Sequence, residues 1–260
     1  MSISVRWVGF DFGGTIQNGS GGYQGTIDSI NEIFTELGKP EIIGEKVTRF
    51  NELLAKYGYE EEMMYGVDED IEFWKRHYRF KRLQEKGLTE FFSYVLDNNQ
   101  DAIKLYQNKR LRHFKATDGL NECLEYLKNK GVSVNIVSEL GSEGTLNIIS
   151  SFLSRFNLWP YFSDVITNYG RIKNNGDLDL SFKGTEKIDG TIYKRLVRDL
   201  LDAGIEPSQA LMIGDHPVED VEKAKENGFY AIQFTGVIKR RVSNAADYVI
   251  SDLRELKKII

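Results

Sequence analysis

Cysteine and histidine are scarce in this sequence. Its 260 residues contain one cysteine, Cys123, and three histidines. A single cysteine cannot form an internal disulfide, and so small a set of Cys and His side chains argues against a structural zinc cluster. Cys123 lies at helical spacing between Leu120 and Leu127, so we expect its side chain to pack in a core.

Long apolar runs and an excess of basic charge are also missing. No uninterrupted apolar run approaches the ~20 residues of a membrane-spanning helix, and no early segment has the apolar core of a signal peptide. Asp and Glu (39) outnumber Lys and Arg (34), which gives a net charge of −5 and argues against a protein that coats nucleic acid. We therefore expect a soluble, cytoplasmic protein with no membrane and no nucleic acid as partner. No pattern indicates its oligomeric state.

The chain is organised around residues 5–15, which read VRWVGFDFGGT. A short apolar run in this stretch ends at Asp11 and is followed at once by another aromatic residue and two glycines. The pattern predicts a buried strand of a parallel sheet, which would carry Asp11 to the edge where such sheets bind ligands. Asp11 is therefore a candidate nucleophile or metal ligand. The alternative is an aspartate that only caps the corner after the strand.

Helical and strand patterns divide the remaining chain in two. Residues 18–114 show helical periodicity and no convincing strand, and include a charged helix expected at about 68–86. From residue 118 onward, helices alternate with predicted strands at 132–138, 164–167, 210–214, 230–234 and 247–250. Such alternation predicts a right-handed parallel α/β sheet, which includes the first strand because the helical block offers it no partner. The predicted domains are a Rossmann-like core, 1–17 plus 115–260, and an inserted all-helical domain, 18–114.

Smaller patterns are interpreted as surface or packing features. Asn175-Gly176 lies between two short apolar segments and predicts a β-hairpin with a type I′ turn. The basic runs at 75–82 and 238–241 are interpreted as solvated surface, because the protein is acidic overall. The alternative for 75–82 is contact with an anionic substrate or with RNA. An aromatic set is expected in the core of the helical domain or at its interface: Phe91, Phe92 and Tyr94.

Polar residues end several predicted strands or open the helix that follows: Asp11, Ser138, Lys187, Asp215 and Asp220. In a parallel sheet these positions meet in one crevice. Asp11 and Asp215 can share a Mg²⁺ ion, while Ser138 and Lys187 can bind a phosphoryl group. Asp220 lies five residues after Asp215 and could orient Lys187 or a metal-bound water.

The order and spacing of these segments resemble the haloacid dehalogenase-like (HAD) superfamily, whose members are mostly Mg²⁺-dependent phosphatases that form an aspartyl-phosphate. The four motifs of the family are similar to DFGGT at 11–15, the strand ending at Ser138, KIDGTIY at 187–193 and GDHPVED at 214–220. The helical insertion lies where many members carry a mobile cap. The resemblance therefore covers the whole chain, with roughly 17–114 matching only as a helical cap.

The resemblance implies a role for each residue of this set. Asp11 would attack phosphorus and become phosphorylated. A Mg²⁺ site would be formed by Asp11, Asp215, Asp220 and the backbone carbonyl of Gly13. The transferring phosphoryl group would be bound by Ser138, Lys187 and Gly14. Phosphoryl transfer needs mainly positioning and charge compensation, and these residues can provide both.

One position departs from the family pattern. Most family phosphatases have a second aspartate two residues after the nucleophile, which protonates the leaving group and activates water. That residue is Gly13 in this chain. Loss of a positioned acid–base group typically costs ~10²–10⁴ in rate. His216 or Glu219 could move the proton instead, although a surface loop position is the favoured interpretation of His216.

Gly13 leaves several functions open. The dehalogenases and phosphonatases of the family also lack the second aspartate, but dehalogenases need no metal, and the intact pair Asp215 and Asp220 argues against that branch. A phosphonatase would need a cap lysine, which the sequence does not single out. The predicted function is a Mg²⁺-dependent phosphatase that acts on a small phosphorylated metabolite through Asp11 and is weakened by Gly13. The alternative is a non-catalytic relative that binds a phosphorylated ligand or partner.

Overall fold

The computed structural model describes residues 3–18, 23–57, 79, 83, 87–109, 114–140, 144–238 and 240–260. The chain forms two compact units: unit 1 consists of Met1–Asn18 and Ala116–Ile260, and unit 2 of Gly19–Lys115. The helix expected at 68–86 and the basic run at 75–82 lie outside the described residues, apart from Arg79 and Leu83. No helix in the described ranges is long and apolar enough to cross a lipid bilayer.

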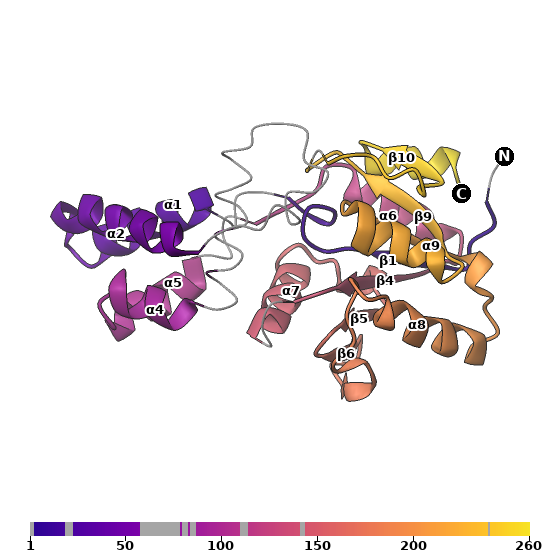
Figure 1. Ribbon diagram of the computed structural model, residues 1–260, viewed down its shortest axis with the longest axis horizontal. Coiled ribbons are helices and arrows are strands. Elements are labelled where there is room, and N and C mark those ends of the chain that lie inside the picture. The colour runs from indigo at the N-terminus through magenta and orange to yellow at the C-terminus, as the bar shows by residue number, and fades with distance from the viewer. Residues whose placement is uncertain are drawn as a thin grey trace. The chain divides into compact units, whose positions relative to one another are not determined.

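Unit 1 is built on an eight-stranded sheet with the order β10-β9-β8-β1-β4-β5-β6-β7 (Figure 1). Its strands are β1 (Trp7–Phe10), β4 (Ser133–Ser138), β5 (Asp164–Thr167), β6 (Gly170–Lys173), β7 (Leu178–Asp179), β8 (Ala210–Gly214), β9 (Tyr230–Phe234) and β10 (Tyr248–Ile250). Neighbouring strands are parallel from β10 to β5, whereas β6 and β7 add an antiparallel edge. This topology confirms the predicted parallel α/β fold.

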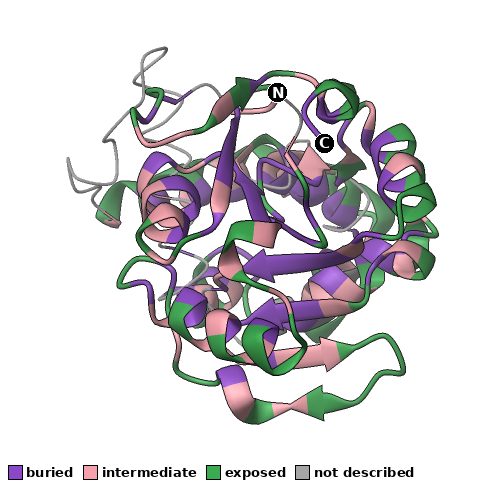
Figure 2. Ribbon diagram, turned by 90° about the vertical axis from the view of Figure 1, so that its right-hand side faces the viewer, coloured by how far each residue is buried: buried purple, intermediate pink, exposed green. Residues whose placement is uncertain are grey.

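The central strands are apolar because both faces of the sheet are covered. Every residue of β1 and β8 is buried, as Figure 2 shows for the middle of the sheet. Side chains alternate between the two faces along a strand. Trp7 and Met212 pack on one face with residues of α8 (Thr191–Asp202) and with Phe229, so Val8 and Phe10 lie on the other.

The register of β1 with its two neighbours brings three strand ends together. Phe10 is paired with Ile136 of β4 and with Ile213 of β8. The next residue is Asp11, whose backbone N–H donates to the carbonyl of Ile213 at 2.8 Å. The carboxyl ends of β1, β4 and β8 therefore lie at the same edge of the sheet.

Helices complete unit 1: α6 (Leu120–Asn129), α7 (Gly144–Arg155), α8, α9 (Lys223–Glu226), and 3₁₀ helices at Trp159–Tyr161, Leu180–Phe182, Pro207–Gln209 and Leu253–Lys258. The segment between β8 and α9 is π-helical, Pro217–Glu222 (η7). Cys123 is fully buried in α6, and this burial raises the pKa of its thiol to about 12. The expected packing role of Cys123 is confirmed.

The β6–β7 hairpin has a different turn from the predicted one. A type I′ turn needs positive φ at both central residues. Here Gly176 has φ +88° whereas Asn175 is not among the residues with positive φ. The Gly176 N–H donates to the carbonyl of Lys173 at 2.8 Å, and the Lys173 N–H donates to the carbonyl of Asp177 at 3.0 Å. The hairpin prediction is confirmed, but its loop has three residues and closes with a glycine bulge, so the type I′ assignment is wrong.

Every secondary-structure element described in unit 2 up to Lys109 is a helix. Its elements are α1 (Tyr23–Glu36), a 3₁₀ helix at Pro40–Ile42, α2 (Ile43–Lys56), α4 (Leu88–Tyr94) and α5 (Gln100–Lys109). Phe91 is at the centre of its core, with ring centroids 5.8 Å from Phe50 and 4.8 Å from Tyr106. Phe92 is partly buried against the same core, whereas Tyr94 is 37% exposed.

The two chain connections between the units pair with each other. β2 (Gln17–Asn18) and β3 (Lys115–Ala116) form a two-stranded sheet. The sequence did not predict these strands, because two residues are too few to show an alternating pattern.

Candidate active site

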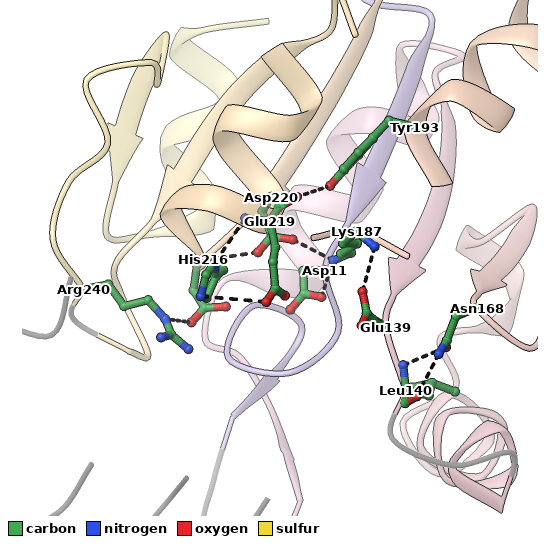
Figure 3. Close-up of polar contacts among 11 residues, drawn as sticks. Asp11, Glu139, Leu140, Asn168, Lys187, Tyr193, His216, Glu219, Asp220 and Arg240 are labelled. Carbon is green, nitrogen blue, oxygen red and sulfur yellow. Dashed lines mark hydrogen bonds and ion pairs between the residues drawn. The ribbon is translucent and has the colours of Figure 1, made fainter. Parts of the chain in front are cut away.

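Asp11 lies directly after β1, with its carboxylate in a buried environment (Figure 3). Its Oδ1 accepts a hydrogen bond from the Lys187 ammonium, with 2.7 Å between Nζ and Oδ1. Burial raises the pKa of Asp11 to about 8, an effect that the charge of Lys187 opposes. A divalent cation beside the carboxylate would also favour its ionised form.

Lys187 bridges two carboxylates. Its Nζ donates to Asp11 Oδ1 at 2.7 Å and to Asp220 Oδ1 at 2.6 Å, and its side chain is 1% exposed. Burial disfavours the charged ammonium, but the two carboxylates outweigh that effect and raise the pKa of Lys187 well above its ordinary value. Lys187 therefore supplies a fixed positive charge between Asp11 and Asp220.

Backbone contacts hold Lys187 in the turn before α8. Its N–H donates to Glu139 Oε2 at 2.7 Å, and its carbonyl accepts from Gly190 N–H at 2.9 Å. Glu139 follows β4 directly, and the next residue, Leu140, exchanges two backbone hydrogen bonds with the Asn168 amide (Figure 3). The segments after β4 and before α8 are thus tied together at the carboxyl edge of the sheet.

Asp220 lies in the π-helical segment that follows β8. Its Oδ2 accepts the backbone N–H of His216 at 2.9 Å, and its own N–H donates to the carbonyl of His216 at 3.1 Å. The carboxylate packs directly on Gly214, where a Cβ would lie 2.2 Å from Asp220 Cγ. Glycine at the end of β8 is therefore required for Asp220 to reach Lys187.

Asp215 is paired with Arg240. The Arg240 Nε donates to Asp215 Oδ2 at 2.7 Å, and the two side chains are 8% and 4% exposed. Interpreting residues 238–241 as solvated surface is therefore wrong for Arg240, although Arg241 is exposed. The charge count of the whole protein could not reveal this pair, because it depends on a tertiary contact between the ends of β8 and β9.

Three carboxylates can hold a cation in this part of the chain. Among the described residues, Asp11, Asp215 and Asp220 offer ligand oxygens that all lie within 4.8 Å of one another, and all three residues are buried. Mg²⁺ prefers such hard oxygen ligands and usually keeps several waters beside a few carboxylates. The donor set therefore fits a hard divalent cation.

Ser138 and Gly14 lie at the same edge of the sheet. Ser138 ends β4, next to β1, and is 5% exposed. Gly14 has φ +82°, and a Cβ there would lie 2.7 Å from Ile238 Cδ1 and 3.2 Å from Asp215 Cγ. This position needs glycine for both its backbone conformation and its close approach to Asp215.

Gly13 is unlike Gly14. It is exposed, and its φ is outside the left-handed region. A Cβ at this position would have no heavy atom within 4 Å among the described residues. Packing in the described part of the chain therefore does not impose glycine at the position where the family resemblance leads us to expect a second aspartate.

His216 has a structural contact that the sequence did not suggest. Its Nδ1 accepts the backbone N–H of Glu219 at 3.1 Å and so caps η7. Burial lowers the pKa of His216, and the residue is partly buried rather than on the surface. With Nδ1 occupied, only Nε2 of this ring, 4.0 Å from Glu219 Oε1, is left for proton transfer.

The sequence alone indicates no role for two further residues of this region. Glu139 receives the Lys187 backbone N–H, and the buried hydroxyl of Tyr193 donates to the carbonyl of Glu219 at 2.8 Å. Burial raises the pKa of Tyr193 well above its ordinary value. Tyr193 belongs to the KIDGTIY segment, so the motif contained it, but only the structure shows that it fixes η7.

Comparison with known proteins identifies relatives of the chain. A family model for haloacid dehalogenase-like hydrolases matches residues 5–228. A curated relative, glyceraldehyde 3-phosphate phosphatase of Pyrococcus furiosus, is 22% identical over 165 residues, which cover 61% of this chain and 60% of that protein. The match therefore spans less than two thirds of the relative's length.

Solved structures share the fold over nearly the whole chain. The HAD hydrolase YfnB of Bacillus subtilis, bound to magnesium, has a TM-score of 0.58 at 15% identity and covers 98% of both chains. A HAD phosphatase of Thermococcus onnurineus has a TM-score of 0.55 at 21% identity, over 98% of this chain and 97% of that one. At these identities the likeness concerns the fold.

Proposed function

Because the chain belongs to the haloacid dehalogenase-like hydrolases, we propose that it is a Mg²⁺-dependent phosphatase for a small phosphorylated metabolite, with Asp11 as nucleophile. The observation that carries this proposal is the bridge of Lys187 between Asp11 and Asp220 inside a buried carboxylate cluster. A buried nucleophile, a fixed cation and a divalent-ion site are the parts that phosphoryl transfer requires.

The metal would be held by Asp11, Asp215, Asp220 and the carbonyl of Gly13. When bound, it supplies positive charge that reduces repulsion between the Asp11 carboxylate and an anionic phosphate ester. Side chains of the protein also compensate the negative charge of the phosphate ester. Lys187 is already charged and fixed 2.7 Å from Asp11, and Ser138 at the end of β4 offers a hydroxyl donor.

In the proposed reaction an Asp11 oxygen attacks phosphorus while the bond to the leaving oxygen breaks. The leaving alkoxide takes a proton, and water then hydrolyses the aspartyl-phosphate to release inorganic phosphate and restore Asp11. Lys187 compensates the charge of the phosphoryl group in both steps. Because Gly13 has no side chain, the first proton comes from water or from another side chain, which favours substrates with good leaving groups.

Unit 2 is proposed to act as the cap that selects the substrate, by analogy with the position of the helical insertion in the family. The curated relative is named for glyceraldehyde 3-phosphate, so short phosphorylated sugars and trioses are the first substrates to test.

The deciding experiment measures phosphate release from a panel of esters with Mg²⁺ and with EDTA. The panel should include an aryl phosphate, with a good leaving group, and glyceraldehyde 3-phosphate. We expect Mg²⁺-dependent turnover that Asp11→Asn abolishes. Asp202→Asn makes the same chemical change at an exposed residue at the end of α8 and should leave turnover unchanged. Activity that persists in Asp11→Asn would exclude Asp11 as nucleophile.

A second candidate function is phosphate-ligand binding without catalysis, and Gly13 is the observation that favours it. The charged half of the site is complete in that case, but the proton-transfer residue is missing. Saturable binding of inorganic phosphate in the presence of Mg²⁺, together with no turnover on any ester, would support this function over the first.

A further inference from the structure

Arg240 places a second fixed cation beside the carboxylate cluster. Its Nε donates to Asp215 Oδ2 at 2.7 Å, and the side chains are 8% and 4% exposed. Because the pair is largely removed from water, separating it would leave two poorly solvated charges. The charge of Arg240 is therefore a lasting part of the site.

A buried glutamine holds the segment that carries Arg240. Gln233 of β9 is fully buried, and its Nε2 donates to the carbonyls of Asp215, at 3.3 Å, and Arg241, at 2.9 Å. Its Oε1 accepts the backbone N–H of Ser243 at 2.7 Å. One side chain thus ties the corner after β8 to both ends of the 241–243 segment and fixes the backbone next to Arg240.

The net charge of the site depends on Arg240 and on whether a divalent cation is bound. With the three carboxylates counted in the ionised form that a divalent cation favours, Lys187 and Arg240 leave these five side chains with a net charge of −1 before the cation is added. A bound divalent ion would change this to +1, which attracts a phosphate dianion. Without Arg240 the same side chains would carry −2, and the metal would bring them only to neutrality.

We propose that Arg240 sets this balance: it weakens the binding of free Mg²⁺ and strengthens the binding of a phosphoryl dianion once the metal is present. The inference rests on the Mg²⁺ site of the proposed function. In this role Arg240 does not touch the reacting atoms and acts through its charge beside Asp215. Mg²⁺ and the phosphate ester would then bind more tightly together than either binds alone.

Loss of Arg240 is expected to change the Mg²⁺ affinity and the phosphate affinity in opposite directions. This distinguishes a role through charge from a role in orienting Asp215. If Arg240 only oriented Asp215, its loss would weaken both metal and phosphate binding, as is usual for partners of metal ligands. If Arg240 acts through its charge, its loss tightens metal binding and weakens phosphate binding.

The test is a pair of calorimetric titrations on Arg240→Gln, which keeps a side-chain N–H donor and removes the charge. The metal-free protein is titrated with MgCl₂, and then the Mg²⁺-saturated protein is titrated with inorganic phosphate. We expect Mg²⁺ to bind about fivefold more tightly and phosphate about fivefold more weakly than in the unmodified protein. Arg241→Gln makes the same change at the exposed neighbouring residue and should alter both affinities by less than about twofold.

Each outcome decides between the roles. A fall in both affinities, or no change in either, would overturn the charge-setting role while leaving the metal site intact. If the unmodified protein binds no Mg²⁺, the proposed metal site fails and the inference fails with it. If circular dichroism shows that Arg240→Gln does not fold, Arg240→Lys decides: the charge role predicts nearly unchanged affinities, whereas an orienting role predicts that both fall.

Discussion

Two corners of one sheet, the turn after β1 and the segment after β8, supply the carboxylates of the site, and these corners are packed differently. At the β8 corner Asp215 and Asp220 are 3% and 2% exposed, and a Cβ on Gly214 would lie 2.2 Å from Asp220 Cγ. At the β1 turn Gly13 is exposed, and a Cβ there would have no described heavy atom within 4 Å. We call the β8 corner the closed corner and the β1 turn, which is open at Gly13 but not at Gly14, the open corner.

Phosphoryl transfer requires charge compensation and proton transfer, and the two corners differ in which of these they can provide. Charge compensation needs groups held in place, and the closed corner holds Asp220 against Lys187 and Asp215 against Arg240. Proton transfer needs one side chain of suitable pKa at the right position, and the open corner has space for it but no side chain. In the proposed phosphatase the charged groups would therefore be fixed, and the proton-transfer group would be the part that is missing.

Removing the ammonium that binds a carboxylate of each corner should have the largest effect. Lys187→Met leaves Asp11 and Asp220 buried without their shared partner, which typically costs ~3–5 kcal/mol of unfolding free energy. We also expect phosphate release to fall by at least ~10². Urea unfolding and the ester panel measure the two quantities.

Lys194→Met is the matched control for this change. Lys194 lies on the exposed side of α8, so its substitution should change neither stability nor turnover appreciably. A Lys187→Met protein as stable as the control would show that the three buried side chains do not depend on one another, and that the closed corner is less constrained than its packing indicates.

Filling the open corner should have the next largest effect. Gly13→Asp supplies the carboxyl group that the family resemblance leads us to expect at this position, and a Cβ there would meet no described heavy atom within 4 Å. We expect turnover on esters with poor leaving groups to rise by about 10–100-fold. The gain should be smaller for an aryl phosphate, whose leaving group needs little protonation.

Gly13→Asn controls for side-chain size, because its amide cannot exchange a proton as a carboxyl group does. If both variants gain equally, the benefit comes from filled space rather than from proton transfer. If neither gains and both still bind phosphate, the non-catalytic function becomes the better explanation of the retained charges.

The sequence was informative where the signal is local. Strands β5, β8 and β9 have their predicted bounds, because each is a short apolar run ended by a polar or glycine residue. The structure also brings the predicted residues Asp11, Lys187, Asp215 and Asp220 together, since parallel strands deliver their ends to one edge.

The sequence was uninformative where position depends on tertiary contacts. Arg240 follows β9 in irregular backbone and reaches Asp215 in a region held by Gln233, whose amide appears in the sequence as one polar residue in a strand. The turn at Asn175-Gly176 was misassigned because the same dipeptide can close two-residue and three-residue loops. Neither the Arg240–Asp215 contact nor the type of turn at Asn175-Gly176 produces a periodic pattern in the sequence.

The smallest expected effect compares the two glycines directly. Gly214→Ala adds a methyl group against Asp220, so we expect a loss of about 1–3 kcal/mol in unfolding free energy and weaker Mg²⁺ binding as Asp220 is displaced. Gly13→Ala makes the same change at the open corner, and its unfolding free energy should stay within about 0.5 kcal/mol of the unmodified protein. Equal losses in the two variants would mean that Gly13 is required by the backbone after all. The missing aspartate would then be a consequence of the fold, and adding it could not restore proton transfer without cost to stability.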